Sequence, residues 1–200
     1  MKSLRILLSL AVLSLSAMAF AQADAHKHAA TQSDAPKSDA QKAFDKLKSL
    51  AGTWRGPVTA DPPQPDWDNK PLWLSMRVTS RGNLLVHEMK QPGTPDDPKH
   101  DDPITTFYVD GDRLLLTHYC DAGNRPRMAA KISPDGKKIE FDFVDVSGGT
   151  QYGHMHHATF TFIDADHHTE DWTYMMPGDK PMHGHMDLER VNEQAAISQK

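Results

Sequence analysis

Turn signals recur at short intervals from residue 53 onward, and this spacing constrains the fold more than any other feature of the chain. Glycine, proline, aspartate and asparagine gather in breaks such as DGD, DAGN, SPDG and PGDK, several of which are standard hairpin connections. The segments between the breaks are short and alternate polar with apolar residues, which is typical of half-buried strands. Ten strands are predicted, over residues 53–59, 72–80, 84–90, 104–109, 113–120, 127–132, 138–146, 152–163, 169–176 and 182–191.

Ten short strands joined by tight turns predict an antiparallel meander, and full closure of such a meander removes its exposed edges. We therefore expect an all-β fold, an antiparallel up-and-down β-barrel of about ten strands. A sandwich of two sheets gives the same alternating pattern and is the alternative. A short helix over residues 43–51 precedes the first strand, with Phe44, Leu47 and Leu50 on one face and Gly52 at its end. We expect this helix to plug one end of the barrel.

The first 21 residues have the pattern of a Sec-type signal peptide. Lys2 and Arg5 precede an apolar run over residues 6–15, and AFA at 19–21 is a small-x-small cleavage motif. The apolar run is too short to span a bilayer, so we expect a bacterial periplasmic or secreted protein. The chain divides into a signal peptide over 1–21, a disordered leader over 22–42, one domain over 43–191 and a C-terminal tail over 192–200.

The composition argues against some classes of partner. The full chain has a formal net charge of -5, which disfavours nucleic acid and anionic membrane surfaces as partners. No other segment is as apolar as the signal region, so we expect no membrane span. Cys120 is the one cysteine and cannot form an internal disulfide, so stability must come from an ordinary core. The oligomeric state is not indicated by the sequence.

The opening of the domain, FDKLKSLAGTWRG at 44–56, resembles the start of the calycin or lipocalin-like superfamily. In that superfamily a short helix leads into a Gly-x-Trp motif on the first strand, and Gly52-Thr53-Trp54 matches it. The resemblance implies that Trp54 packs across the closed end of a calycin-like barrel. Residues 43–191 as a whole are similar to exported bacterial proteins of unknown function with such a barrel, on the stretches DGDRLLLTHYCDAGNRPRM, GHMHHATFTFIDADHHTEDWTY and LERV. This wider resemblance implies the fold and export, and no activity.

The domain is similar, more distantly, to nitrobindin-type barrels. Those barrels hold haem through a histidine on the barrel wall near the C-terminal strand. His183 and His185 lie in the last predicted strand of this chain. The resemblance therefore implies haem as a candidate cofactor. The chain departs from the nitrobindin pattern at the first strand, where GTWRGPV has a proline in place of a small residue.

Histidines are concentrated near the end of the domain, with seven of the twelve between residues 154 and 185. Side chains at i and i+2 of a strand share a face, so His154 lies beside His156 and His183 lies beside His185. Imidazole suits zinc and copper, and four imidazoles could hold one ion. A predicted strand separates the two pairs, so they meet only if they converge across the barrel interior.

Alternation also assigns the two sides of the segment QYGHMHHATFTF at 151–162. His154 and His156 continue the face of Phe160, which we predict to be the core side. Met155 and His157 continue the opposite face, which we predict to be the outer side. Two histidines would then line the polar end of an otherwise apolar stripe.

The segment THYCDAGNRPRM at 117–128 has the densest mixture of reactive side chains in the chain. If residues 121–124 form its turn, His118 lies opposite Arg127 on the same face, with Tyr119 and Asn124 near the rim. An arginine beside a histidine on an inner wall suits an anionic group. On the later strand 169–176, Glu170 shares a face with Trp172 and could line a cavity beside it.

These patterns predict an exported barrel that binds a small, partly apolar ligand with a polar or anionic head group in its cavity. The candidate ligand-binding residues are His118, Tyr119, Asn124, Arg127, His154, His156, Trp172 and His185. One alternative is a protein that binds copper, zinc or haem, with His154, His156, His183 and His185 as candidate metal ligands. Another is an enzyme of unknown reaction with His118 as acid/base, although no Gly-x-Ser-x-Gly, Walker, HExxH or CxxC motif occurs.

Overall fold

The computed structural model describes residues 36–65, 68, 70–90 and 103–191. They belong to one compact unit, Pro36–Lys200. The elements are α1 (Asp39–Lys48), β1 (Gly52–Asp61), β2 (Pro71–Thr79), the 3-10 turn η1 (Ser80–Gly82), β3 (Leu84–Lys90), β4 (Ile104–Asp110), β5 (Arg113–Tyr119), β6 (Arg125–Ile132), β7 (Lys138–Ser147), β8 (His154–Phe162), β9 (His167–Met176) and β10 (Lys180–Arg190). The predicted signal peptide, residues 22–35 of the predicted leader and the tail from residue 192 lie outside the described residues.

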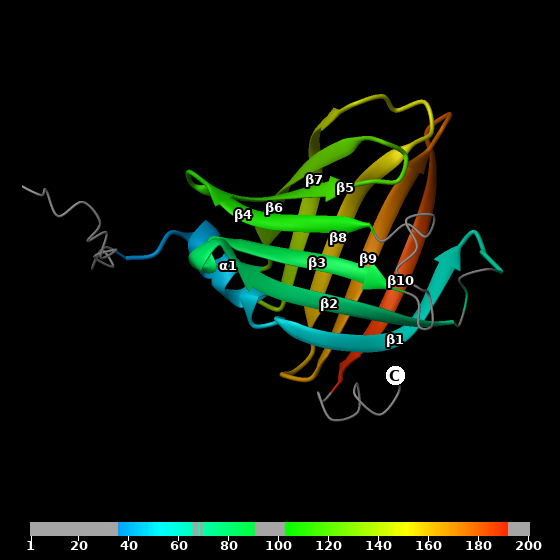
Figure 1. The fold of residues 1–200 in the computed structure, drawn as a ribbon. Helices are drawn as coiled ribbons and strands as arrows, with labels where there is room; N and C mark the ends of the chain where they lie inside the picture. Colours follow the sequence, from blue (N-terminus) through cyan, green and yellow to red (C-terminus); the bar gives the residue numbers. More distant parts are fainter. Residues whose placement is uncertain (1–35, 66–67, 69, 91–102, 192–200) are drawn as a thin grey trace, which may run out of the picture. The chain divides into compact units, whose positions relative to one another are not determined.

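The ten strands form a closed barrel in the order β1-β10-β9-β8-β7-β6-β5-β4-β3-β2, and every neighbouring pair is antiparallel (Figure 1). This confirms the predicted up-and-down barrel and excludes the two-sheet sandwich. All ten predicted strands are present, with ends that differ by no more than two residues. Within the described residues no helix is both long and apolar enough to cross a membrane.

Helix α1 begins earlier than the sequence predicted. It starts at Asp39 because the Ser38 side chain caps it by accepting a hydrogen bond from the backbone of residue 41. Residues 39–42, which we assigned to the leader, are therefore helical. The helix lies at one end of the barrel, packed against β4 and β5 (Figure 1). Its buried face consists of Ala40, Ala43, Phe44 and Leu47.

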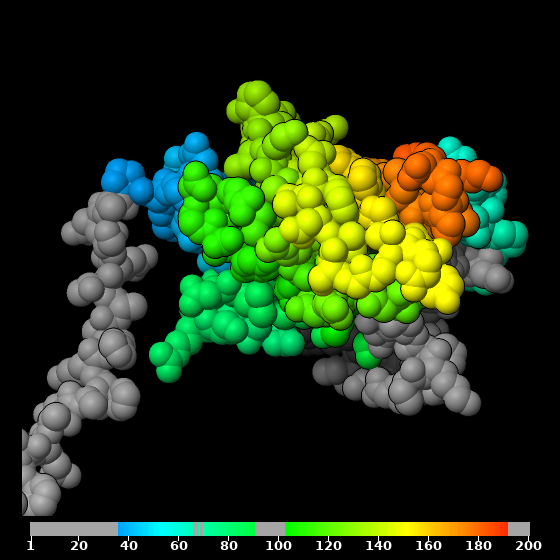
Figure 2. Space-filling model, turned by 90° about the horizontal axis from the view of Figure 1, so that it is seen from above, coloured from blue at the N-terminus to red at the C-terminus, as the bar shows by residue number. Residues whose placement is uncertain are grey.

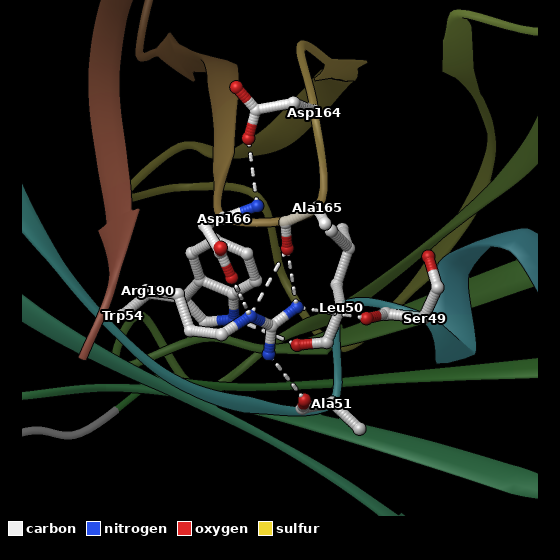
Figure 3. Close-up of polar contacts among 8 residues, drawn as sticks. All are labelled: Ser49, Leu50, Ala51, Trp54, Asp164, Ala165, Asp166 and Arg190. Carbon is white, nitrogen blue, oxygen red and sulfur yellow. Dashed lines mark hydrogen bonds and ion pairs between the residues drawn. The ribbon is translucent and has the colours of Figure 1, made fainter. Parts of the chain in front are cut away.

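The barrel end next to α1 is closed by Trp54 of β1 and Arg190 of β10 (Figure 3). The Trp54 side chain is 0% exposed, and its Nε1 donates to the Leu50 carbonyl at 2.7 Å. The Arg190 guanidinium lies 4.1 Å from the centre of the Trp54 ring, which is a cation–π stack. It also donates to the carbonyls of Ser49, Ala51 and Ala165 and to the Asp166 carboxylate. The resemblance implied this closing role for Trp54.

The same stack explains the glycine of the Gly-x-Trp motif. A Cβ added to Gly52 would lie 2.6 Å from Nη1 of Arg190, and the φ of Gly52 is +138°. An L side chain at this position would be strained and would displace the guanidinium. The motif is therefore one half of an interaction whose other half, Arg190, lies more than a hundred residues later in the chain.

The opposite end of the barrel, which we call the mouth, carries the β1–β2, β5–β6, β7–β8 and β9–β10 connections. Figure 2 shows the residues around 150 (yellow) and the β9–β10 turn (orange) far from α1 (blue). Apolar side chains fill the part of the interior that lies nearer to α1. Phe107, Phe141 and Phe160 are all 0% exposed, with ring centroids 5.4 to 5.9 Å apart. The interior is thus dense at one end, so any opening must face the mouth.

Replacing Arg190 with alanine should lower the free energy of unfolding by about 2–4 kcal/mol, because the cation–π stack and the hydrogen bonds to three carbonyl groups are lost together. Urea denaturation of the wild type and the variant measures this change. Arg113→Ala is the matched control, because the ion pair of Arg113 with Asp110, at 3.7 Å, is exposed. That control should change stability by less than about 1 kcal/mol. Equal losses in the two variants would contradict the closing role of Arg190.

Candidate functional site

Three polar side chains form a row across the inner wall of the barrel. The strand register places His87 of β3 opposite Thr105 of β4, and Thr105 opposite His118 of β5. Residues directly opposite each other share a face, and all three are buried between apolar neighbours on that face. Thr105 Oγ1 and His118 Nδ1 share a hydrogen bond of 2.8 Å.

Strand β9 presents a second polar set to the interior, with His168, Glu170 and Trp172 at alternate positions. The Glu170 carboxylate accepts hydrogen bonds from Trp172 Nε1 at 2.9 Å and from His168 Nε2 at 3.1 Å. It also accepts from His87 Nε2 at 2.9 Å. Because β3 and β9 are not neighbours in the barrel, this last bond crosses the interior. We call His87, Thr105, His118, His168, Glu170 and Trp172 the interior polar cluster.

Glu170 is a fully buried carboxylate whose charge is compensated within the cluster. Burial by itself raises the pKa of Glu170, but the charges and hydrogen bonds of His87 and His168 outweigh burial and hold that pKa below its ordinary value. The cluster also holds two unpaired polar atoms, because Nδ1 of His87 and Nδ1 of His168 are buried and have no partner among the described residues. Each such unpaired group costs about 1–3 kcal/mol. Buried groups of this kind are a feature of functional sites.

His118 differs from the other two histidines because it has no charged hydrogen-bond partner. Burial, followed by repulsion from His87, lowers its pKa from 6.5 to about 4, while Asp121 acts weakly in the opposite direction. The imidazole is therefore neutral at pH 7. Its Nε2 makes no hydrogen bond within the described residues. This nitrogen is also not one of the side-chain atoms that are both fully buried and unpaired. Thr105 can donate to or accept from Nδ1, so Nε2 can accept from or donate to a ligand.

The packing of the inner wall loosens on the mouth side of the cluster. Inward-facing side chains there are only half-buried, as for Met89, Met155, Tyr174 and Met182, whereas those near α1 are almost fully buried. A Cβ added to Gly184, which faces inward beside Trp172, would meet no atom within 4 Å. The rim of the mouth carries exposed apolar side chains, namely Ile104, Tyr119, Val144, Tyr152 and Met176. The arrangement is an apolar entrance that leads to a polar floor.

The predicted pairing of His118 with Arg127 is wrong. Arg127 lies opposite Thr117, so it points to the outer face and forms a two-pronged ion pair with Asp145. The backbone N–H of Cys120 donates to the Asn124 carbonyl at 3.1 Å, so the β5–β6 turn closes over three residues, 121–123, instead of the four we assumed, and Gly123 has a φ of +77°. A change of one residue in register moves a side chain to the opposite face of a sheet. Arg127 therefore does not supply a cation to the interior.

The other candidates of that hairpin take separate places. Tyr119 lies on the rim of the mouth and is 48% exposed. Asn124 is buried, and its Nδ2 donates to the carbonyls of Gly149 at 2.9 Å and Gly153 at 2.7 Å. It ties the β5–β6 turn to the β7–β8 connection, which braces the mouth. The loop between β3 and β4 lies outside the described residues except for Pro103.

His154 and His156 lie near the mouth, where a β-bulge between Met155 and His157 interrupts the alternation of β8. Both rings contact the Phe143 ring, with centroids 5.0 and 4.8 Å away, and they are linked to each other at 3.2 Å. Burial is the main cause that lowers the pKa of His154, and the electrostatic effect of the neighbouring His156 is the second cause. The bulge makes Met155 pack against the core, so its predicted outward position is wrong.

His183 and His185 lie on the outer face of β10, because Gly184, Met186 and alternate residues take the inner face. His185 Nδ1 donates to Asp171 at 2.6 Å, and His183 Nδ1 shares a hydrogen bond with Thr173 at 3.1 Å. The four imidazoles predicted as metal ligands are therefore not brought together. Across the part of the chain that the structure describes, no three His, Cys, Asp or Glu side chains are grouped to hold a metal.

Sequence reasoning placed Trp172 and Glu170 on the inner face but missed His87, Thr105 and His168 as site residues. The signal for His87 was present, since it alternates with Leu85 and Met89 on the inner face of β3. A single histidine within such a stripe resembles ordinary polar lining. Only the closed barrel brings His87 next to Glu170, 83 residues later in the chain.

The chain matches no protein-family model, and a search of curated proteins finds no similar protein. Its fold is similar to Rv2717c from M. tuberculosis, with TM-score 0.50 and 16% identity over 75% of this chain and 98% of that one. A DUF3598 family protein of unknown function from Nostoc punctiforme gives TM-score 0.49 and 14% identity over 72% of this chain, which spans about half (48%) of that protein. An S-type phycobiliprotein lyase from Guillardia theta gives TM-score 0.38 and 6% identity over 79% of this chain and 99% of that one. Likeness at these identities shows the fold alone.

Replacing Glu170 with glutamine should destabilise the barrel by about 3–5 kcal/mol, because His87 and His168 lose a buried anionic acceptor and the new NH2 group opposes their N–H donors. Urea denaturation measures the loss. Glu140→Gln is the matched control on the outer face of β7, and it should change stability by no more than about 0.5 kcal/mol. A Glu170 variant as stable as the control would show that the charge is not compensated as described.

His118 should make the barrel less stable in acid. The unfolded chain protonates His118 below its ordinary pKa of 6.5, whereas the folded chain does so only near 4. The unfolded state therefore binds more protons between these values, and stability falls as the pH drops through that window, by about 3 kcal/mol in total. The stability difference between wild type and His118→Asn, measured in urea at pH 7 and pH 4.5, should shift by about 2–3 kcal/mol against the wild type. A difference that does not change with pH would contradict the lowered pKa.

Proposed function

We propose that the barrel is an exported binding protein for a small, mainly apolar and uncharged ligand, which enters through the mouth and hydrogen-bonds to Nε2 of His118. One observation carries the proposal. His118 is a buried, neutral imidazole on the inner face of the barrel, held in place by Thr105, and its Nε2 is unpaired among the described residues. Sites for small ligands combine an apolar concave wall with a few placed polar groups.

An uncharged head group fits this interior better than the anionic group that the sequence suggested. The arginine that was to receive an anion, Arg127, lies on the outer face and is paired with Asp145. The Glu170 carboxylate already accepts hydrogen bonds from His87, His168 and Trp172, and His118 is neutral. Burying an ionised group without a partner is very unfavourable. A hydroxyl group, by contrast, can either donate to or accept from Nε2 of His118.

The apolar part of the ligand would lie between the cluster and the rim. Met89, Met155 and Met182 line this part of the interior and are half-buried. Methionine side chains are flexible and polarizable, so they adapt to ligands of different shape. Met176 is exposed at the rim, two positions beyond the inward-facing Tyr174 on β9, so it offers an apolar contact between the surface and the interior.

Displacement of the neutral fluorescent probe N-phenyl-1-naphthylamine tests the proposal. From the displacement curves, 1-decanol should show a dissociation constant at least about tenfold lower than that of decanoate at pH 7.5, because decanoate must bury an unpaired charge. His118→Leu should weaken 1-decanol by about fivefold, the equivalent of one lost neutral hydrogen bond. Glu189→Ala on the outer face is the control and should leave both affinities unchanged. Absence of probe binding, or tighter binding of decanoate, would overturn the proposal.

A metal or haem protein is a second candidate, and His118 is the observation that favours it. A neutral imidazole with one nitrogen hydrogen-bonded and the other unpaired is the form in which histidine binds metals and haem iron. The test is the metal content of the purified chain and its absorption spectrum after addition of haemin. A Soret band that His118→Leu abolishes would replace the first proposal with this one. A colourless chain without stoichiometric copper, zinc or iron would remove this candidate.

Export is supported by the sequence pattern of residues 1–21. Expression of the full chain in a bacterium, followed by mass spectrometry of the periplasmic fraction, tests both export and the cleavage position. We expect the mature chain to begin at Gln22, after the AFA motif. Recovery of the uncut chain in the cytoplasm would contradict this part of the proposal.

A further inference from the structure

The wall next to Trp172 has unusually small side chains. The register places Ala60 of β1, Gly184 of β10, Trp172 of β9 and Ala158 of β8 in one row on the inner face. Every neighbour of Trp172 in this row therefore has at most a methyl group. The next inward-facing row towards α1 is filled by Val58, Met186, Glu170 and Phe160. The step from large to small side chains leaves room beside the Trp172 ring.

Gly184 creates this room without serving the backbone. At Gly56, a Cβ would lie 1.7 Å from the Asp187 carbonyl oxygen, so close approach of the backbone requires that glycine. At Gly184 a Cβ would meet nothing within 4 Å, and its φ lies outside the left-handed region. Glycine inside a strand weakens the strand and often marks the close approach of a ligand. Glycine at position 184 is therefore not required by the backbone, and its effect is to leave space on the inner wall.

Trp172 is held rigidly at the border of this space. Its Nε1 donates to Glu170 at 2.9 Å, which fixes the orientation of the indole. Its ring centroid lies 5.7 Å from that of His87 and 5.8 Å from that of His118. A preorganised aromatic surface favours binding of another flat ring, because little side-chain freedom is lost.

We infer that the ligand carries a flat aromatic ring, which lies against Trp172 in the space left by Gly184 and Ala60, and that a hydroxyl or similar uncharged group on this ring hydrogen-bonds to His118. The short distance between Trp172 and His118 places a substituent of such a ring within reach of the imidazole. The ligand class is an uncharged phenol or naphthol-like aromatic alcohol. This inference rests on the proposed function and deepens it.

Calorimetric titration with two matched alcohols tests the inference. 2-Naphthol and decahydro-2-naphthol have the same carbon skeleton and one hydroxyl group, but only the first is flat and aromatic. We expect 2-naphthol to bind about tenfold more tightly, the upper range for an aromatic pair. Gly184→Val should fill the space and bring the affinity ratio close to one, and Trp172→Leu should do the same by removing the aromatic partner.

Glu189→Ala is the matched control, because Glu189 lies on the outer face of the same strand as Gly184 and does not line the hollow beside it. It should keep the tenfold ratio, and thermal unfolding should show that Gly184→Val is folded, since the added side chain has space. If neither alcohol binds to the wild type, the proposed function fails and the inference fails with it. If both bind equally, or if Gly184→Val keeps the ratio, the inference fails while the proposed function stands.

Discussion

The stack of Arg190 on Trp54 joins parts of the chain that the strand ladder alone does not connect. A single guanidinium links the last strand and the Trp54 of the first strand to the end of α1 and to the β8–β9 turn (Figure 3). The plug at the α1 end is thus tied to the closing β1–β10 ladder by one residue pair. Because this end is sealed and densely packed, any opening of the interior must lie at the mouth, and the chemistry of the barrel follows from that asymmetry.

The interior polar cluster lies between the packed end and the open end. Glu170 is the fixed charge in it, and His87 and His168 compensate that charge from two different strands. Trp172 shares the same carboxylate and is therefore held at the border of the open part. His118 alone is left neutral, with a nitrogen available to a ligand. Burying these polar groups does not favour stability by itself. Their arrangement is explained if they form a preorganised polar surface for an uncharged ligand.

Some of this could be predicted from the sequence, and the failures have physical causes. Alternation and turn residues define the ten strands and the inner position of Trp172, because these depend on neighbouring residues only. The position of Arg127 depends on whether a turn has three or four residues, and a single glycine with positive φ decides that. The bulge beside His156 and the bond between His87 and Glu170 depend on contacts made only after closure. Sequence patterns therefore located the walls of the barrel but not the contents of its interior.

A crystal structure of the protein with bound 2-naphthol tests the central claim most directly. The account predicts one ligand inside the barrel on the mouth side of Glu170, with its ring against Trp172 and its hydroxyl oxygen about 2.7–3.0 Å from Nε2 of His118. The side chains of the interior polar cluster should keep the hydrogen bonds described above. Density for the ligand only on the outer wall, or an interior in which Met89, Met155 and Met182 have collapsed over His118, would contradict it.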